Sequence, residues 1–334
     1  MKRIGAVLGV LALVGTLGAT ETRVWTYAQG GAGFLLDDEI IIRFYPGQMF
    51  RFGNFVTIEN PVVLGGSLWG AYKYASAFYT GEGFGIGAYV GEVVPVNAGF
   101  TPIDVYPLNA VIGVNAGNAK IGLNFKVGHA SEGNASGTVI GFRPGITMDL
   151  GGGSGLDMAV FFDYAGGTDG TNSTSEMGFG LDGRYYGPIV LPMMIHFYRS
   201  NGSTTVDLRA GAGNTLNLGS GNVLATGFVG FNNFNNGKQF YLGSVLGGEF
   251  NVWRGLIVRG SISYDLIKYT STSGGNSSLS FGYAGPFTLG AGYDLGFARV
   301  DLALSTDLIT NGPFFLTGNS GSAMVTMLSI LGKF

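Results

Sequence analysis

The sequence contains no cysteine, which excludes a disulfide framework and a lipid anchor on a cysteine. Charged residues make up only 12% of the chain, against about 25% in soluble domains. The net charge of −3 is too close to neutral to indicate nucleic acid as a partner. Beyond the N-terminal segment, no stretch offers the roughly 18 uninterrupted apolar residues of a membrane helix. The low fraction of charged residues is therefore not explained by a membrane helix.

Groups that support catalysis are scarce as well. The only histidines are His129 and His196, and they do not have the His-Glu-x-x-His spacing of a zinc protease. The chain also has no Gly-x-Ser-x-Gly motif, the turn that carries a nucleophilic serine. Asp37, Asp38 and Glu39 are consecutive, so on a strand their side chains would point to alternate faces and could not share one metal ion. We therefore expect no enzyme, no cofactor and no metal site.

What the sequence does contain is glycine, 61 of 334 residues, and strands that alternate with a period of two. In residues 156–164, apolar Leu, Met, Val, Phe and Tyr alternate with Asp, Ala and Phe, and residues 298–308 repeat the pattern. In a membrane barrel one face of each strand meets lipid and the other meets a polar lumen. The pattern predicts an all-β fold, an antiparallel transmembrane β-barrel, although a soluble sandwich would alternate in the same way.

The two ends of the sequence favour the membrane alternative. Lys2 and Arg3 precede a short apolar run that ends near Ala19, which is typical of a secretory signal peptide over residues 1–19. The last strand ends in Phe334, the pattern read by the barrel-assembly machinery. We therefore expect a multi-pass protein of the bacterial outer membrane, with outer-membrane lipid and that machinery as its partners.

The connections between strands alternate between long and short. The long ones, such as Val94–Pro107 and Ala165–Thr174, are rich in Gly, Asn, Ser and Thr. The short ones, such as Gly151–Gly155, would face the periplasm. Counting strands back to one near Phe50–Ile58 gives about 16, and the weak segments near Val62 and Val111 leave 14 open.

Ahead of the first strand, the stretch GGAGFLLDDEIIIRFYPGQM (Gly30–Met49) resembles the N-terminal signature of the FadL-like, TodX-type outer-membrane transport protein family. The matching positions are Gly30, Gly31, Ala32, Asp37, Asp38, Tyr45, Pro46 and Gly47. The chain departs from the motif where Pro46 directly follows Tyr45. The family's barrels generally have 14 strands.

The resemblance implies a barrel plugged by its N-terminal segment, which carries hydrophobic small molecules inward and releases them sideways. Residues 20–49 would then be the plug, with Phe44, Tyr45 and Pro46 in or near the solute path. Asp37 and Asp38 would pair with wall arginines or the periplasmic rim. The alternative is a solvated periplasmic tail.

The strand at Ile189–Arg199 breaks the alternation, because Pro192, Met194 and His196 make its second face apolar or amphipathic too. We expect Met194 and His196 to dock the plug or line the solute path. Pro192, like Pro144 in another strand, lacks a ladder donor, and a closed barrel has no free edge to hold it. Each proline predicts a bulge or kink, either a lateral opening or a feature that only shapes the wall.

Charges of both signs in similar numbers are expected on the inward face, which indicates cross-strand pairing or, alternatively, solute selection. They are Lys120, Lys126, Arg143, Arg184, Arg209, Arg259, Arg299, Asp157, Asp163, Asp182, Asp207, Asp265, Asp301 and Asp307.

These expectations divide the chain into a signal peptide (1–19), a plug or periplasmic segment (20–49) and the barrel (50–334). A channel or transporter for hydrophobic or small solutes fits the plug and the apolar strand. A general diffusion porin fits the count of 16 strands, and a structural or adhesive barrel fits the loops.

Overall fold

The computed structural model describes residues 39–60, 74–98, 101–200, 203–234, 237–272, 274–304 and 325–334. The predicted signal peptide, Asp37, Asp38 and Asp307 lie outside these residues. Three short helical segments come first: η2 (Glu39–Arg43), η3 (Pro46–Gln48) and α3 (Met49–Phe52). No helix among the described residues is long and apolar enough to cross a membrane.

Eighteen strands follow among the described residues. They are β1 (Phe55–Asn60), β2 (Tyr74–Thr80), β3 (Phe84–Val90), β4 (Val94–Ala98), β5 (Thr101–Val105), β6 (Leu108–Ala116), β7 (Ala119–Glu132), β8 (Ala135–Gly151), β9 (Ser154–Thr168), β10 (Ser173–Tyr186), β11 (Leu191–Ser200), β12 (Ser203–Asn217), β13 (Gly221–Phe234), β14 (Gly237–Trp253), β15 (Leu256–Thr272), β16 (Ser277–Asp294), β17 (Ala298–Leu304) and β18 (Val325–Lys333).

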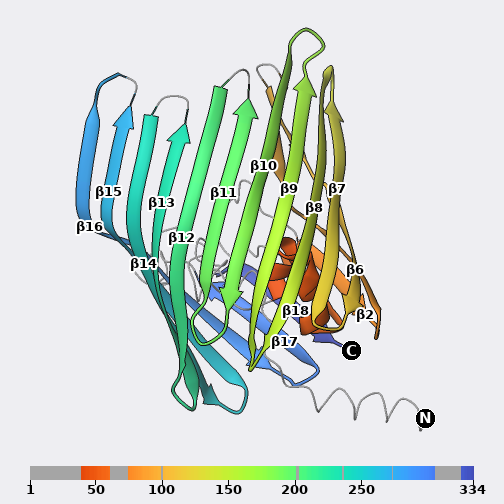
Figure 1. Cartoon of the computed structure of the whole chain (residues 1–334), viewed down its shortest axis with the longest axis vertical. Coiled ribbons are helices and arrows are strands. Elements are labelled where there is room, and N and C mark those ends of the chain that lie inside the picture. Colours follow the sequence, from red (N-terminus) through yellow and green to blue (C-terminus); the bar gives the residue numbers. More distant parts are fainter. Residues whose placement is uncertain are drawn as a thin grey trace, which may run out of the picture.

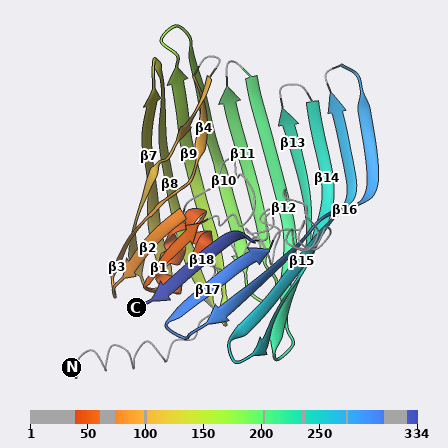
Figure 2. The ribbon, with the colours of Figure 1, turned by 180° about the vertical axis from the view of Figure 1, so that it is seen from behind.

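Sixteen of these strands form one closed antiparallel barrel, in which β3 pairs with β6 and β18 closes onto β1. Phe55 on β1 is opposite Lys333 on β18 at this closure. Figures 1 and 2 show the wall from both sides, with the C-terminal strand β18 beside the helical segments at one end of the barrel. The predicted fold class is confirmed, with 16 strands rather than 14.

The two faces of the wall follow the predicted alternation. On β9, Asp157, Ala159 and Phe161 are buried on the inside, whereas Met158 and Val160 are exposed on the outside. Exposed Ile, Leu, Val and Phe side chains recur on the outward positions of most other strands. A closed barrel with an apolar outer face leaves no unpaired strand edge, which is the condition for a strand structure in lipid.

Several predicted connections are wrong in length because the strands run further. The expected loop at Ala165–Thr174 is a turn at residues 169–172, and the Gly- and Ser-rich residues on either side continue β9 and β10.

The first strand begins at Phe55 rather than near Phe50, because Met49–Phe52 forms the helix α3. Gly53 follows this helix with a φ of 76°.

The expected loop at Val94–Pro107 contains the hairpin β4–β5, which folds into the lumen. Val96, Ile103 and Val105 of the hairpin pack against Val139 on the inner face of β8. This contact lies near the β7–β8 turn, at the end of the barrel opposite the helical segments. The hairpin buries its apolar face there because the wall residues that it contacts include valine and glycine.

Neither proline produces the predicted bulge. Phe142 pairs with Phe162 and Gly145 with Ala159, so the β8–β9 register is the same before and after Pro144. The ladder omits only Arg143 and Pro144 themselves, since proline has no N–H to donate. Pro192 likewise interrupts the β11–β12 pairing without shifting it. A lateral opening at either residue stays a prediction.

Candidate functional site

The helical segments 39–52 include the described part of the predicted plug (20–49) and are called the plug from here on. They lie inside the barrel, near the end that holds the C-terminus (Figure 1). Beneath the plug, small residues face one another across five neighbouring strands. Gly85 of β3 pairs with Gly113 of β6, Gly113 with Gly122 of β7, Gly122 with Gly145 of β8, and Gly145 with Ala159 of β9. We call these five positions the glycine row.

The glycine row brings the backbone of the plug into direct contact with the wall. A Cβ atom on Gly122 would clash with the backbone of Pro46 and Gly47, and one on Gly145 would come within 2.9 Å of the Pro46 ring. A Cβ on Gly113 would lie 2.9 Å from the sulfur of Met49. Only residues without side chains leave room for the plug at these positions.

A buried carboxylate, Asp157 of β9, anchors the plug. Gln48 Nε2 donates hydrogen bonds to its two oxygens at 2.7 and 2.9 Å. The Arg184 guanidinium of β10 donates at 2.7 and 3.0 Å, and the Thr147 hydroxyl of β8 at 2.6 Å. All donors converge on a carboxylate with no exposed surface, so its charge is compensated by Arg184.

The apolar side of the plug packs against the same wall. Ile41 and Tyr45 form a buried cluster with Ala159 of the glycine row. The Arg184 guanidinium carbon lies 5.4 Å from the centre of the Tyr45 ring. Burial raises the pKa of the Tyr45 phenol above its usual value, and the nearby Asp182 carboxylate adds to that shift. Tyr45 is therefore a neutral anchor.

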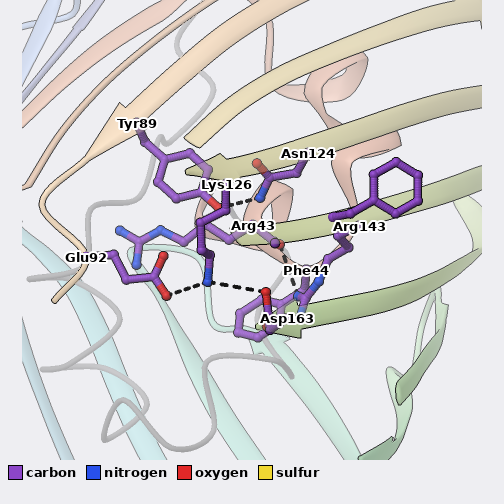
Figure 3. Close-up of a pocket in the computed structure, with 10 residues that line it drawn as sticks. Arg43, Phe44, Tyr89, Glu92, Asn124, Lys126, Arg143 and Asp163 are labelled. Carbon is purple, nitrogen blue, oxygen red and sulfur yellow. Dashed lines mark hydrogen bonds and ion pairs between the residues drawn. The ribbon is translucent and has the colours of Figure 1, made fainter. Parts of the chain in front are cut away.

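Beside the plug is a cavity of about 240 Å³, hereafter the chamber (Figure 3). It lies between the plug at one end of the barrel and the β4–β5 hairpin at the other. Its lining combines charged, amide and aromatic side chains: Arg43, Phe44, Tyr89, Glu92, Asn124, Lys126, Gly141, Phe142, Arg143 and Asp163.

The charged groups of the chamber are paired with one another. Lys126 Nζ lies 2.8 Å from a Glu92 oxygen and 3.8 Å from Asp163 (Figure 3). Arg143 donates a hydrogen bond to the Arg43 carbonyl of the plug at 3.1 Å and lies 3.7 Å from Asp182. The Arg43 guanidinium lies over the Tyr74 and Tyr89 rings, so the polar lining holds three cationic and two anionic side chains.

A second group of lumen side chains follows the wall from β9 to β11. His196 Nε2 is 2.6 Å from Asp182 Oδ1, and Tyr198 OH is 3.3 Å from His196 Nδ1. The edge of the His196 ring meets Phe161 with 4.7 Å between ring centres. Met194 is buried on the same inward face. This face, expected to be apolar or amphipathic, carries aromatic rings that are also hydrogen-bonded.

Away from the plug, four buried charges close a ring between β14, β15 and β17. Arg259 contacts Glu249 at 2.5 Å and Asp301 at 2.7 Å, while Arg299 contacts Glu249 at 3.2 Å and Asp301 at 3.0 Å. Gly292 of β16 leaves room for the Arg259 and Asp301 side chains between the strands. The predicted pairing of inward charges is confirmed by this ring and by Asp157 with Arg184.

The residues predicted for a solute path therefore divide between different surroundings. Phe44 lines the chamber, while Tyr45 and Pro46 are buried against the wall. Met194 and His196 line the lumen further along. Sequence reasoning missed Gln48, Glu92, Tyr89, Asn124 and the glycine row, because their roles depend on strand register.

Across the described ranges, no three His, Asp or Glu side chains gather closely enough to hold a metal ion. The fold and the site together define a closed 16-strand β-barrel with an inserted plug and a polar lumen.

Comparison with known proteins gives similarities of fold only. No protein-family model and no curated protein sequence matches the chain. Among solved structures, CdiB from Escherichia coli is similar with a TM-score of 0.44 and 11% identity, over 84% of this chain and 62% of that one. CdiB from Acinetobacter baumannii gives 0.44 and 10%, over 84% and 60%, so the chain spans about three fifths of both CdiB structures.

Two further structures are outer-membrane or channel proteins by their descriptions. A loop-deletion mutant of OmpT, an outer membrane protein of Vibrio cholerae, gives a TM-score of 0.36 and 10% identity, over 84% of this chain and 97% of that one. A deletion mutant of the TodX monoaromatic hydrocarbon channel gives 0.25 and 9%, over 84% and 89%.

Proposed function

We propose that the chain is a non-enzymatic outer-membrane channel for small solutes, closed near one end by its plug. Two observations together support the proposal. The wall has an apolar outer face and a polar lumen, and the plug occupies the glycine row inside that lumen. A barrel of about 16 strands is wide enough to hold an aqueous path. The plug and the β4–β5 hairpin make that path narrow.

The hydrogen bonds that hold the plug suit a segment that can be displaced. Gln48 binds Asp157, and Arg143 binds the Arg43 carbonyl, so water can replace each plug group if the segment moves. Asp157 would keep Arg184 and Thr147 as partners in the wall. Membership of the FadL-like family, sideways release and hydrophobic solutes remain proposals that rest on the motif at Gly30–Met49.

A general diffusion porin is the second candidate, favoured by the 16 strands and the charged inner wall. The plug and the hairpin inside the lumen count against it. A purely structural barrel would need neither a chamber nor an inserted plug.

Single-channel conductance of the refolded chain, residues 20–334, distinguishes these candidates. We expect the intact chain to conduct little and a variant lacking residues 20–52 to open in large, discrete steps, since the glycine row is then empty. Deleting only residues 20–45 is the matched control: it leaves Pro46–Phe52 on the row and should give a smaller increase. Equal, large conductance of all three chains would indicate a porin, and no conductance in any would indicate a structural barrel.

A further inference from the structure

The chamber holds a buried polar group that its neighbours do not satisfy. Asn124 of β7 is 5% exposed and donates a hydrogen bond from Nδ2 to the Tyr89 hydroxyl at 2.5 Å. Within the part of the chain that the structure describes, its Oδ1 atom has no hydrogen-bond partner. If the two ends of the amide were exchanged, the other end would be left unpaired instead. Because Asn124 also lines the chamber, a molecule bound there can supply the missing hydrogen bond.

The charges around Asn124 define the kind of ligand. Lys126 is already paired with Glu92 and Asp163, and Arg143 with Asp182 and the Arg43 carbonyl. The Arg43 guanidinium lies over the Tyr74 ring at 4.0 Å and the Tyr89 ring at 5.5 Å. An anionic or cationic solute would have to compete with these pairs. A neutral hydroxyl avoids that competition, because it can donate to an amide or carboxylate oxygen and accept from an ammonium or guanidinium group.

The remaining features of the chamber agree with a small ring-shaped solute. Its volume of about 240 Å³ lies below the roughly 300–1,000 Å³ of pockets for drug-sized ligands. The aromatic rings of Phe44 and Tyr89 lie among the polar groups that line it (Figure 3). Such a lining suits a molecule with hydroxyls at its edge and C–H groups on its faces.

We propose that the chamber binds a neutral polyhydroxylated solute of monosaccharide size, with Asn124, Tyr89 and Lys126 as specificity-determining residues. That this molecule is transported rests on the proposed channel function, whereas its binding does not. The inference departs from the hydrophobic solutes that the N-terminal resemblance implies.

Isothermal titration of the refolded chain in detergent tests the binding. D-glucose is the neutral probe, and glucuronate and glucosamine are anionic and cationic probes of similar size that keep the same ring. We expect saturable glucose binding and at least about tenfold weaker binding of both charged probes. No glucose binding, or tighter binding of a charged probe, would overturn the proposal.

Variants locate the site. Asn124→Leu should weaken glucose binding about threefold to tenfold, the range expected for one hydrogen bond. The matched control is Asn232→Leu: Asn232 lies on β13 outside the chamber, and its Oδ1 also has no partner among the described residues. If both variants bind like the intact chain, or both lose binding equally, the assignment to the chamber fails.

Two readouts keep the test decisive. If Asn124→Leu does not refold, Tyr89→Phe serves in its place, because it removes only the hydroxyl that Asn124 contacts. This variant should refold like the intact chain and bind glucose more weakly. Conductance measured beside titration separates the two proposals. A conducting barrel that does not bind glucose contradicts the solute class, and a glucose-binding barrel that never conducts contradicts the channel.

Discussion

At the scale of single residues, the carboxylates on the inner wall differ in how completely they are bonded. Asp157 is fully buried yet receives hydrogen bonds from the plug and from two wall strands. The lumen-facing Asp163 is different: its side chain is 35% exposed and lies 3.8 Å from Lys126. The two carboxylates were indistinguishable in the sequence, since both alternate with apolar residues on the same strand.

This contrast predicts unequal losses of stability. Asp157→Asn leaves the buried Arg184 guanidinium without a counter-charge and should lower the free energy of unfolding by about 3 kcal/mol or more. Asp163→Asn, the control on the same strand, should cost at most about 1 kcal/mol because water screens that pair. Urea titrations of both variants in lipid vesicles measure the difference. Equal losses would mean that Asp157 does not anchor this part of the wall.

At the scale of elements, the plug and the wall fit because five small residues align across five neighbouring strands. The glycine row runs from Gly85 on β3 to Ala159 on β9 and removes side chains where the plug backbone passes. Glycine in a strand weakens it and marks close approach of another backbone. The row therefore indicates that plug docking is a specific part of the fold.

A methyl group should disturb this docking. Gly122→Ala places a Cβ against the backbone of Pro46 and Gly47, so the plug should lift while the barrel stays closed. Trypsin should then cleave after Arg43 faster than in the intact chain, and heat-modified migration on gels should persist. Gly183→Ala on β10 is the control, because nothing lies within 4 Å of its Cβ position. The same cleavage rate in both variants would argue against the glycine row as the plug's seat.

At the scale of the whole molecule, the proposed membrane location depends on the outward face being apolar around the closed barrel. On β12, Leu208 is 37% exposed on the outside, and Thr205, three residues earlier, lies on the inner face beside Tyr198. Lipid tolerates an outward charge far less than a polar lumen does.

Leu208→Arg should therefore cost about 2–4 kcal/mol in refolding titrations in vesicles if residue 208 lies near the middle of the bilayer. Thr205→Arg, the control on the same strand, should cost less because the new charge faces the lumen near Asp207. In detergent micelles the difference should shrink, since micelles adapt their shape. Equal costs in vesicles would contradict the membrane orientation.

The sequence by itself determined most of the barrel strands, a number between 14 and 16, and which face of each turns outward. These are local properties, because side chains alternate along any strand and an apolar face needs an apolar neighbour. The inward charges Asp157 and Arg184 could be identified on the same basis, as could the amphipathic segment around Phe44 and Tyr45.

Only the tertiary structure decided where these pieces meet. The glycine row, the partners of Asp157 and the chamber around Asn124 all depend on register between strands, and a sequence pattern carries no record of which residue lies opposite which. The loop at Val94–Pro107 became an inserted hairpin for the same reason: its valines pack on a wall segment more than 30 residues away. Side-chain periodicity is read along one strand, whereas a site inside a barrel is assembled across many.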